Sequence, residues 1–336
     1  MSAIEAHVIS DCRELAALAP DWARLWERCP NSTPFQSPGW LLPWWSAFGP
    51  GELMSIGVFS AGRLVGLAPL YLEANSASQR LLPLGIPLSD YVDVLIEPDF
   101  EAPVGEAMLR AIESEMRWST LEWNELSPRA AALHLDGLRS SSVTEEISSA
   151  CPVLALNDTS AGGAIYLPAS KRRKLRMARH RAERRGAIEF VDTDAASPEL
   201  LFESLVTLHS ACWHARLESG VLADTRVCAF HKESIAKLDG IVRLHALWIG
   251  GETAAVYYGF EHRERAYAYL SGFSPSFAHE SPGSLLLEHV IAESCCSGVR
   301  EFHFLRGGES YKYEWGARDR FNRRREFQRA APSSHD

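Results

Sequence analysis

Apolar and polar residues follow a regular order along the second half of the chain. Three stretches rich in aromatic and β-branched residues are separated by short turns with glycine or charged residues, so they predict an antiparallel meander. A helical pattern follows Pro282 and Gly283, and Gly298 marks its end. One more strand-like stretch comes after that glycine. The five predicted elements are residues 241–249, 253–262, 266–274, 284–296 and 300–305.

A weaker version of this strand-strand-strand-helix-strand order occurs in the first half. Its predicted elements are residues 53–60, 63–74, 90–98, 102–116 and 119–126. Because the order occurs twice, we expect an internal repeat and two domains. Small and polar residues at 157–163 are typical of a junction, so we place the domains at residues 1–156 and 157–336.

Residues 171–185 carry nine Lys or Arg and one Glu, although the formal net charge of the chain is −9. Leu175, Ala178 and Ala182 recur at helical spacing, so we expect a helix with a narrow apolar stripe and basic flanks at the start of the second domain. Two interpretations stay open. The helix is either a solvated face near a domain boundary or a surface that binds phosphate or another anionic group.

Composition narrows the class of protein. A chain of 336 residues with 46% hydrophobic residues can bury a sizeable core, and its negative charge argues against binding along DNA. No stretch approaches the roughly 20 apolar residues of a membrane span, and the first residues lack the order of a secretory signal. Seven cysteines without a C-x-x-C pair suit a reducing compartment, so we expect a cytoplasmic protein.

A metal site is not expected from the sequence. His209, Cys212 and His214 have a metal-like appearance, but only the first two share a face on a helix and no fourth ligand is near in sequence.

The segment 300–317 begins like a strand and then places charges beside aromatic rings. The charged residues are Arg306, Glu309 and Lys312, and the rings are those of Tyr311, Tyr313 and Trp315. Such a mixture suits a pocket that shields a reaction from water. Ion-pair networks also cluster charge, so a salt-bridged loop that docks the two halves is the alternative.

Several motifs can be compared with known families. Residues 281–283 (SPG) precede the predicted helix, Gly298 follows it, and residues 303–316 read HFLRGGESYKYEWG. In the first half, residues 33–40 read TPFQSPGW and residues 89–95 read SDYVDVL. With these motifs the chain resembles, over nearly its whole length, the CelD/BcsL-like acetyltransferases of the GNAT superfamily, which are close to the tandem-GNAT FemAB peptidoglycan ligases.

The resemblance implies an α/β (α+β) fold class with two tandem GNAT-like (acyl-CoA N-acyltransferase) domains, each a mixed, mostly antiparallel sheet flanked by helices. It also implies transfer of an acyl group from acetyl-CoA or another acyl-CoA to an amine. In this layout the strand at 300–305 splays from its neighbour, and the active site lies at its end. The family usually has Asp where His303 and Gly308 stand here, so roles of those two carboxylates do not carry over.

The same layout implies roles for residues of the charged segment. Glu309 would relay the proton of the amine, Tyr311 would protonate the leaving group, and Lys312 would neutralise a donor phosphate or an oxyanion. Arg306 would line the same cleft. The FemAB ligases have a similar aromatic-Lys-x-x-aromatic-Gly run, which supports Lys312 in particular.

Other candidates concern the binding of donor and acceptor. A helix N-terminus can hold a phosphate through its free N–H groups, which favours Gly283 and Ser284, although SPGSLL keeps one glycine of the usual GNAT loop and also suits a plain capped helix. The further candidates for donor binding are Arg172, Arg173 and Arg176, and those for acceptor binding are Asp90, Tyr91, His303 and Trp315.

Three functions stay open. The first is an N-acyltransferase that acts on a small-molecule or saccharide amine, such as an amino sugar or precursor in exopolysaccharide or cellulose biosynthesis. The second is a FemAB-like aminoacyl ligase that uses tRNA, with the basic helix in contact with phosphates. No extended heptad run like the coiled coil of some such ligases occurs, which favours the first. The third is a noncatalytic partner of a membrane polysaccharide synthase, in peripheral contact with it.

Overall fold

The computed structural model describes residues 3–73, 79–138, 141–156, 167–214 and 219–329. The chain divides into two compact units, one of residues 1–149 with 320–336 and one of residues 150–319. The predicted junction at 157–163 lies outside the described residues. The C-terminal strand, which we placed in the second domain, belongs mainly to the first unit because β15 (Arg318–Arg329) pairs with β8 (Thr120–Leu126).

The first unit combines short strands with helices. Its other elements are β1 (Ile4–Ile9), α1 (Cys12–Ala17), α2 (Ala19–Arg28), η1 (Pro34–Gln36), α3 (Pro38–Phe48), β2 (Gly51–Leu53), β3 (Ser55–Ser60), β4 (Arg63–Ala68), β5 (Leu70–Glu73), β6 (Arg80–Pro83), β7 (Leu95–Ile96), η2 (Pro98–Phe100), α4 (Glu101–Ser114) and η3 (Ala131–His134). Strands β1, β3, β4 and β7 form one antiparallel sheet, and α4 packs against the first three of them. Strand β9 (Ser141–Ala155) carries residues of both units.

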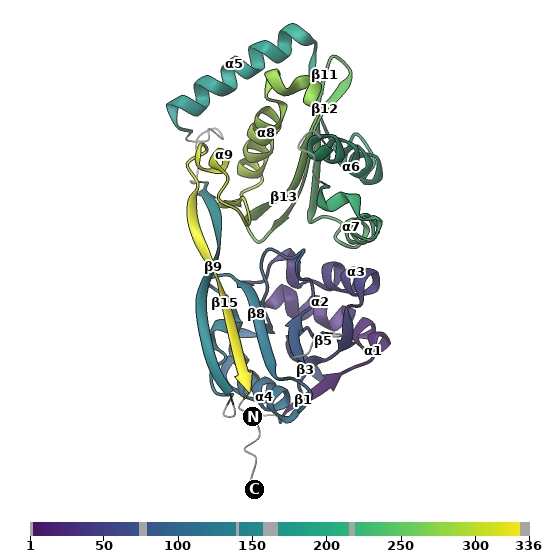
Figure 1. The fold of residues 1–336 in the computed structure, drawn as a ribbon, viewed down its shortest axis with the longest axis vertical. Coiled ribbons are helices and arrows are strands. Elements are labelled where there is room, and N and C mark those ends of the chain that lie inside the picture. The colour runs from purple at the N-terminus through teal and green to yellow at the C-terminus, as the bar shows by residue number, and fades with distance from the viewer. Residues whose placement is uncertain (1–2, 74–78, 139–140, 157–166, 215–218, 330–336) are drawn as a thin grey trace. The chain divides into compact units, whose positions relative to one another are not determined.

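The second unit contains the predicted meander. Its elements are α5 (Ala169–Arg185), β10 (Ile188–Asp192), α6 (Pro198–His214), η4 (Val221–Ala223), α7 (Thr225–Lys237), β11 (Val242–Ile249), β12 (Glu252–His262), β13 (Arg265–Phe273), η5 (Pro275–Glu280), α8 (Pro282–Cys296), β14 (Glu301–His303) and α9 (Ser310–Tyr313). Strands β10 to β13 pair antiparallel in chain order. Helix α8 covers one face of this sheet, and α6 and α7 lie on the other (Figure 1).

Strand β14 leaves its neighbour early. It pairs parallel with β13 only where residues 265–267 face residues 301–303, whereas β13 continues to Phe273. The two strands therefore part near the middle of the sheet, at the end of β14, as the layout implied by the family resemblance requires.

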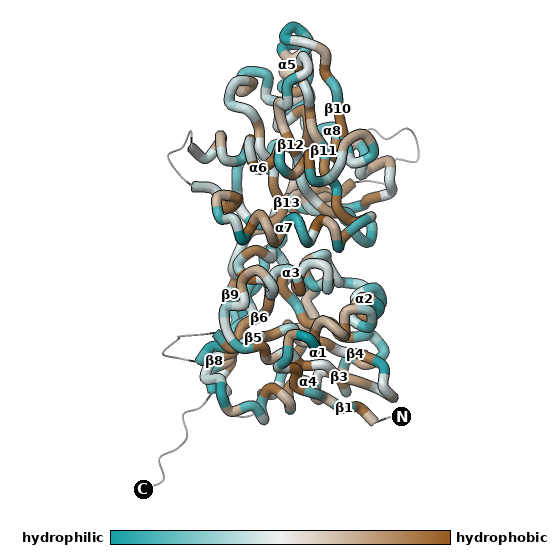
Figure 2. Tube along the Cα trace, turned by 90° about the vertical axis from the view of Figure 1, so that its right-hand side faces the viewer, coloured by the Kyte–Doolittle hydropathy of each residue, from teal (hydrophilic) through white to brown (hydrophobic). Residues whose placement is uncertain are grey.

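The hydrophobic pattern explains the central strands. Strands β11 and β12 are buried along most of their length, because helices cover both faces of the sheet, and Figure 2 shows hydrophobic residues gathered in them. The turn between them uses Gly250 and Gly251, both at positive φ, where glycine is least strained. The predicted order of three strands, a helix and a strand is confirmed here by β11, β12, β13, α8 and β14.

The first half follows the predicted order with two differences. The stretch 63–74 forms two strands of different sheets, β4 and β5, because Pro69 between them has no N–H group to continue a ladder. The stretch 90–98 is a strand only at β7. Before it, the Asp93 carboxylate accepts hydrogen bonds from the backbone N–H groups of Val94, Ala131 and Ala132, which hold a loop in place.

Buried polar side chains connect the two first-half motifs to each other. The Gln36 side chain accepts from the Thr33 backbone at 2.8 Å and donates to the carbonyl of Tyr91 at 2.7 Å. The Trp40 indole N–H donates to the Ser89 hydroxyl at 3.0 Å. Buried polar groups with partners are costly to disturb, so these motifs hold the unit together.

Two candidate acceptor-binding residues lie within this network. Asp90 and Tyr91 are 8% and 4% exposed. The Asn322 side chain of β15 donates to the carbonyl of Asp90 and to the Glu125 carboxylate, and the Tyr91 ring lies edge-on to Phe35. In the structure these residues pack and bond inside the first unit, which limits their access to an acceptor.

We expect Gln36→Ala to destabilise the first unit. The substitution leaves a buried carbonyl and a buried N–H group without their partner, which typically costs about 1–3 kcal/mol. Differential scanning calorimetry should show a lower melting temperature for one transition. Gln328→Ala is the control, because Gln328 is exposed on the same unit and its side chain bonds only to Glu326 among the contacts described. Equal shifts for both variants would contradict the structural role of Gln36.

Candidate functional site

The N-terminus of α8 opens onto free space in the second unit. Ser281 precedes the helix with φ 53° and Pro282 occupies its first position, where a missing N–H group does no harm. A side chain on Gly283 would meet no atom within 4 Å. Pro282 has no N–H group, and the N–H groups of Ser284 and Leu285 donate to the Ser281 carbonyl. The N–H group of Gly283 and the helix dipole are therefore what this terminus offers to an anion.

Helix α5 lies across this end of α8 (Figure 1). Leu175, Ala178 and Ala182 are buried along its inner face, as the sequence predicts. The helix ends where Gly186 passes Gly250, so closely that a Cβ on Gly186 would lie 2.4 Å from the Gly250 Cα atom. The inner face of α5 therefore has a defined place against the second unit.

A pocket of about 360 Å³ lies between α5 and the start of α8. Its lining residues are Lys171, Lys174, Leu175, Met177, Ala178, Arg181, Ser281, Ser284 and Glu314. Three of these side chains are cationic and one is anionic, so the pocket carries a surplus of positive charge beside a helix N-terminus.

Lys171 is a buried cation of the pocket lining. It is 3% exposed, with Nζ 4.2 Å from the centre of the Trp315 ring, 3.5 Å from Glu314 Oε2 and 3.4 Å from the Ser284 hydroxyl. Burial lowers the pKa of Lys171, while Glu314 acts in the opposite direction. Lys174 is exposed and pairs with the same Glu314 at 2.7 Å.

Arg181 reaches the start of α8 from the other end of the pocket. Its Nη2 atom lies 3.5 Å from the Ser281 hydroxyl, and its buried Nε atom has no hydrogen-bond partner among the described residues. A buried donor without a partner costs free energy, which a bound anion would recover.

The structure brings together a different set of cations from the one predicted. Arg172, Arg173 and Arg176 are exposed and do not line the pocket. Side chains three, four or seven positions apart share a helix face, so the cations that flank the buried stripe are those that reach α8. The signal in the sequence is helical phase, because positions 171, 174 and 181 flank or join the buried stripe at 175, 178 and 182.

Lys312 holds the chain that follows β14. Its ammonium donates to the carbonyls of Leu305, Arg306 and Gly307 at 3.3, 2.7 and 3.1 Å, and it lies 2.9 Å from Glu309 Oε2. The side chain is 3% exposed. An ammonium has three protons, and three carbonyls accept them here, so these contacts support a positioning role for Lys312.

Glu309 and Tyr311 are the accessible members of this segment. The Glu309 side chain is 58% exposed, and Tyr311 keeps 47% of its surface accessible while its ring edge meets Phe304. Partial burial and the Glu309 carboxylate raise the pKa of Tyr311 to about 12, so its hydroxyl stays protonated at neutral pH. Arg306 lies between them and β14, partly buried.

The two other candidates for acceptor binding are buried in this unit. His303 ends β14, lies 3.2 Å from Glu301 Oε2, and has its ring against Tyr267. Trp315 is fully buried beneath Lys171, so it shapes the pocket from below. Glu314, which we did not single out, follows α9 directly and joins this segment to the pocket.

Comparison with known proteins supports the fold. Residues 169–313 match a family described as an acetyltransferase (GNAT) domain. The chain is similar to a crystal structure of FemX, with 10% identity, a TM-score of 0.64 and 96% of each chain covered. It is also similar to L-PGS from Bacillus licheniformis, with 16% identity, a TM-score of 0.59, and 97% and 94% of the two chains covered. No curated protein matches the sequence.

These likenesses show a mixed α/β fold of the GNAT-like kind, with sheets flanked by helices, and confirm the predicted fold class. Among the described residues, no helix has the length and apolar character that crossing a bilayer requires.

We expect Lys312→Met to lower the stability of the second unit. Methionine keeps most of the side-chain volume but leaves three carbonyls without their donor, at a cost of about 1–3 kcal/mol or more. Thermal unfolding followed by circular dichroism measures the change. Lys232→Met is the control, because Lys232 forms an exposed pair with Glu203, worth about 0–1 kcal/mol. A Lys312→Met protein as stable as wild type would refute the positioning role.

Proposed function

We propose that the protein is an N-acyltransferase that takes an acyl group from acyl-CoA and passes it to an amine. The observation that carries this proposal is the basic pocket at the N-terminus of α8, the helix that joins β13 to the strand that splays from it. The match of residues 169–313 to a GNAT domain family supports it.

The pocket suits the phosphates of the donor. Lys174 and Arg181 line it together with Ser281 and Ser284, whose hydroxyls can also bind a phosphate. A pyrophosphate here would take over contacts that Glu314 now makes with Lys171 and Lys174, and would meet the N–H group of Gly283 at the start of the helix. The surplus of positive charge in the pocket favours replacement of the Glu314 carboxylate by the pyrophosphate.

The segment after β14 supplies the groups for transfer. The amine nitrogen forms a bond to the thioester carbonyl carbon and loses a proton, for which Glu309 is the acceptor. The carbon–sulfur bond then breaks, and Tyr311, protonated at neutral pH, supplies a proton to the thiolate. Arg306 adds positive charge beside the developing oxyanion. Lys312 keeps these residues in place through the loop carbonyls.

The acceptor follows from the motif resemblance to CelD/BcsL-like acetyltransferases. We propose an amino sugar or a related amine used in exopolysaccharide or cellulose assembly, with the protein in peripheral contact with a membrane polysaccharide synthase.

A second candidate is transfer of an aminoacyl group from tRNA, as in FemAB-like ligases. Arg172, Arg173 and Arg176 are exposed on the outer face of α5 and form no ion pair among the contacts described, which leaves them available to a phosphate backbone. The likeness to FemX concerns the fold and is compatible with this candidate.

Two variants of equal charge change separate the donors. We expect Lys174→Gln/Arg181→Gln to weaken CoA binding at least about tenfold, because a hydrogen bond to a charged group contributes about 1.5–3 kcal/mol. Arg172→Gln/Arg173→Gln should leave CoA affinity unchanged within about twofold, because these side chains face solvent. Isothermal titration calorimetry measures both, and thiol release with a panel of acyl-CoAs and amines measures turnover.

A different result would indicate aminoacyl-tRNA as the donor in place of acyl-CoA. If the outer-face variant lost tRNA affinity and wild type neither bound CoA nor released thiol, the aminoacyl ligase would replace the first proposal. A wild-type protein that bound neither donor would support a noncatalytic partner of a polysaccharide synthase.

A further inference from the structure

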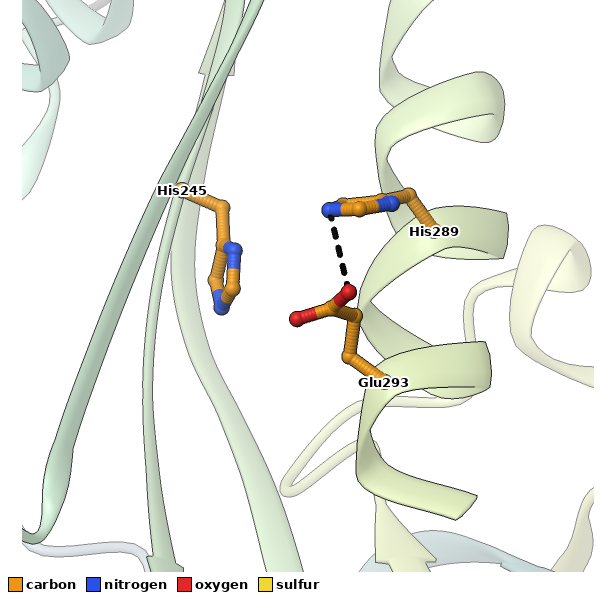
Figure 3. Close-up of side chains that lie close together, drawn as sticks. All are labelled: His245, His289 and Glu293. Atoms are coloured by element: carbon orange, nitrogen blue, oxygen red, sulfur yellow. Dashed lines mark ion pairs between the residues drawn. The ribbon is translucent and has the colours of Figure 1, made fainter. Parts of the chain in front are cut away.

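Three potential metal ligands meet on the α8 face of the second unit, away from the phosphate pocket. His245 comes from β11, and His289 and Glu293 come from α8, one helical turn apart. One nitrogen of each imidazole and one carboxylate oxygen all lie within 4.8 Å of one another. Figure 3 shows the Glu293 carboxylate turned toward both rings, and His289 Nε2 lies 3.9 Å from Glu293 Oε1.

Packing does not account for His245. Its side chain is 6% exposed, and its buried Nδ1 atom has no hydrogen-bond partner among the described residues. An unsatisfied buried polar atom costs about 1–3 kcal/mol. A ligand that accepted the lone pair of a neutral imidazole would remove part of that cost.

The surroundings keep both rings in the form that binds a metal. Burial, assisted by His289, lowers the pKa of His245 to about 4, and burial also lowers the pKa of His289. Both imidazoles are therefore neutral at pH 7, with a lone pair free. The Phe190 ring stacks on His289 at 4.0 Å with a 13° tilt and so orients its plane.

Nearby charges of both signs act on this cluster, since Arg243 also lowers the pKa of His245 and Arg179 also lowers the pKa of His289. Arg179 already pairs with Glu288 and Arg243 with Glu261, each at 3.1 Å. Asp192 acts on both histidines as an additional negative charge. The two arginines near the cluster are thus paired with carboxylates, while Asp192 and Glu293 supply negative charge for a divalent ion.

We propose that His245, His289 and Glu293 bind a divalent transition-metal ion, with Zn²⁺ the preferred one. Two imidazoles and a carboxylate are a ligand set that suits Zn²⁺ and disfavours Mg²⁺ and Ca²⁺, which take oxygen ligands. Bonds of about 2.0–2.2 Å require each ligand atom to move inward by less than about 1 Å. The Glu293 side chain is 52% exposed and free to do so.

The bound ion ties α8 to the sheet. It joins the C-terminal half of α8 to β11, whereas the N-terminus of the same helix forms the phosphate pocket. Three protein ligands leave a fourth position for water. The site is therefore a clamp that stabilises the second unit, and its existence does not depend on acyl transfer.

Titration of the tag-free protein with zinc chloride tests this site. Isothermal titration calorimetry should show one Zn²⁺ per chain, and the melting temperature of the second unit should rise with Zn²⁺ but not with Mg²⁺ at equal concentration. Cobalt(II) should give the visible absorption bands of a nitrogen-ligated four-coordinate ion. We expect His289→Ala and Glu293→Gln each to weaken Zn²⁺ at least about tenfold, since even a change beside a metal ligand costs about 10–100-fold.

His180→Ala is the matched control, and it should keep wild-type Zn²⁺ affinity. His180 lies 3.3 Å from Glu183 on a helix of the same unit, but both are exposed, and among the described residues no third metal-ligand group joins them. His289→Ala and Glu293→Gln are chosen because these side chains are less buried than His245, whose loss would endanger folding. The proposal is overturned if wild type binds no Zn²⁺, or if His180→Ala weakens binding as much as His289→Ala does.

Discussion

The ammonium of Lys312 is the contact on which the second unit's candidate site depends. After β14 the chain leaves the sheet, and Leu305 and Gly307 adopt positive φ, so the carbonyls there have no strand to pair with. One buried side chain satisfies three of them and also meets Glu309. Arg306, Glu309 and Tyr311 are placed by this arrangement, and the buried lysine is 3% exposed.

Helix α5 and α9 are coupled through charge. Glu314, directly after α9, is shared by Lys171 and Lys174 of α5, and Lys171 lies over the buried Trp315 ring. A phosphate that entered the pocket would compete with Glu314 for both lysines. Under the proposed function, donor binding at α5 would thereby be connected to the position of the segment that carries Tyr311, through contacts that are all within the second unit.

The two units share an order of elements but differ in the helix that follows the meander. Helix α4 of the first unit begins with Glu101, whereas α8 begins beside a pocket with surplus positive charge. An acidic first turn competes with an anionic ligand for the helix terminus. In the first unit the motifs at 33–40 and 89–95 form buried hydrogen bonds with each other. The proposal of an anionic donor therefore concerns the second unit.

The sequence by itself determined the meander and the helices α4, α5 and α8, because hydrophobic periodicity reports which face of an element is buried. Its motifs implied the fold class through the family resemblance. It also located the charged segment after β14. Only the tertiary structure decided that Lys312 bonds to carbonyls, that Lys171, Lys174 and Arg181 rather than Arg172, Arg173 and Arg176 line the pocket, and that His245 meets His289. These contacts join residues of different elements, and helical phase and packing, which composition does not record, set their distances.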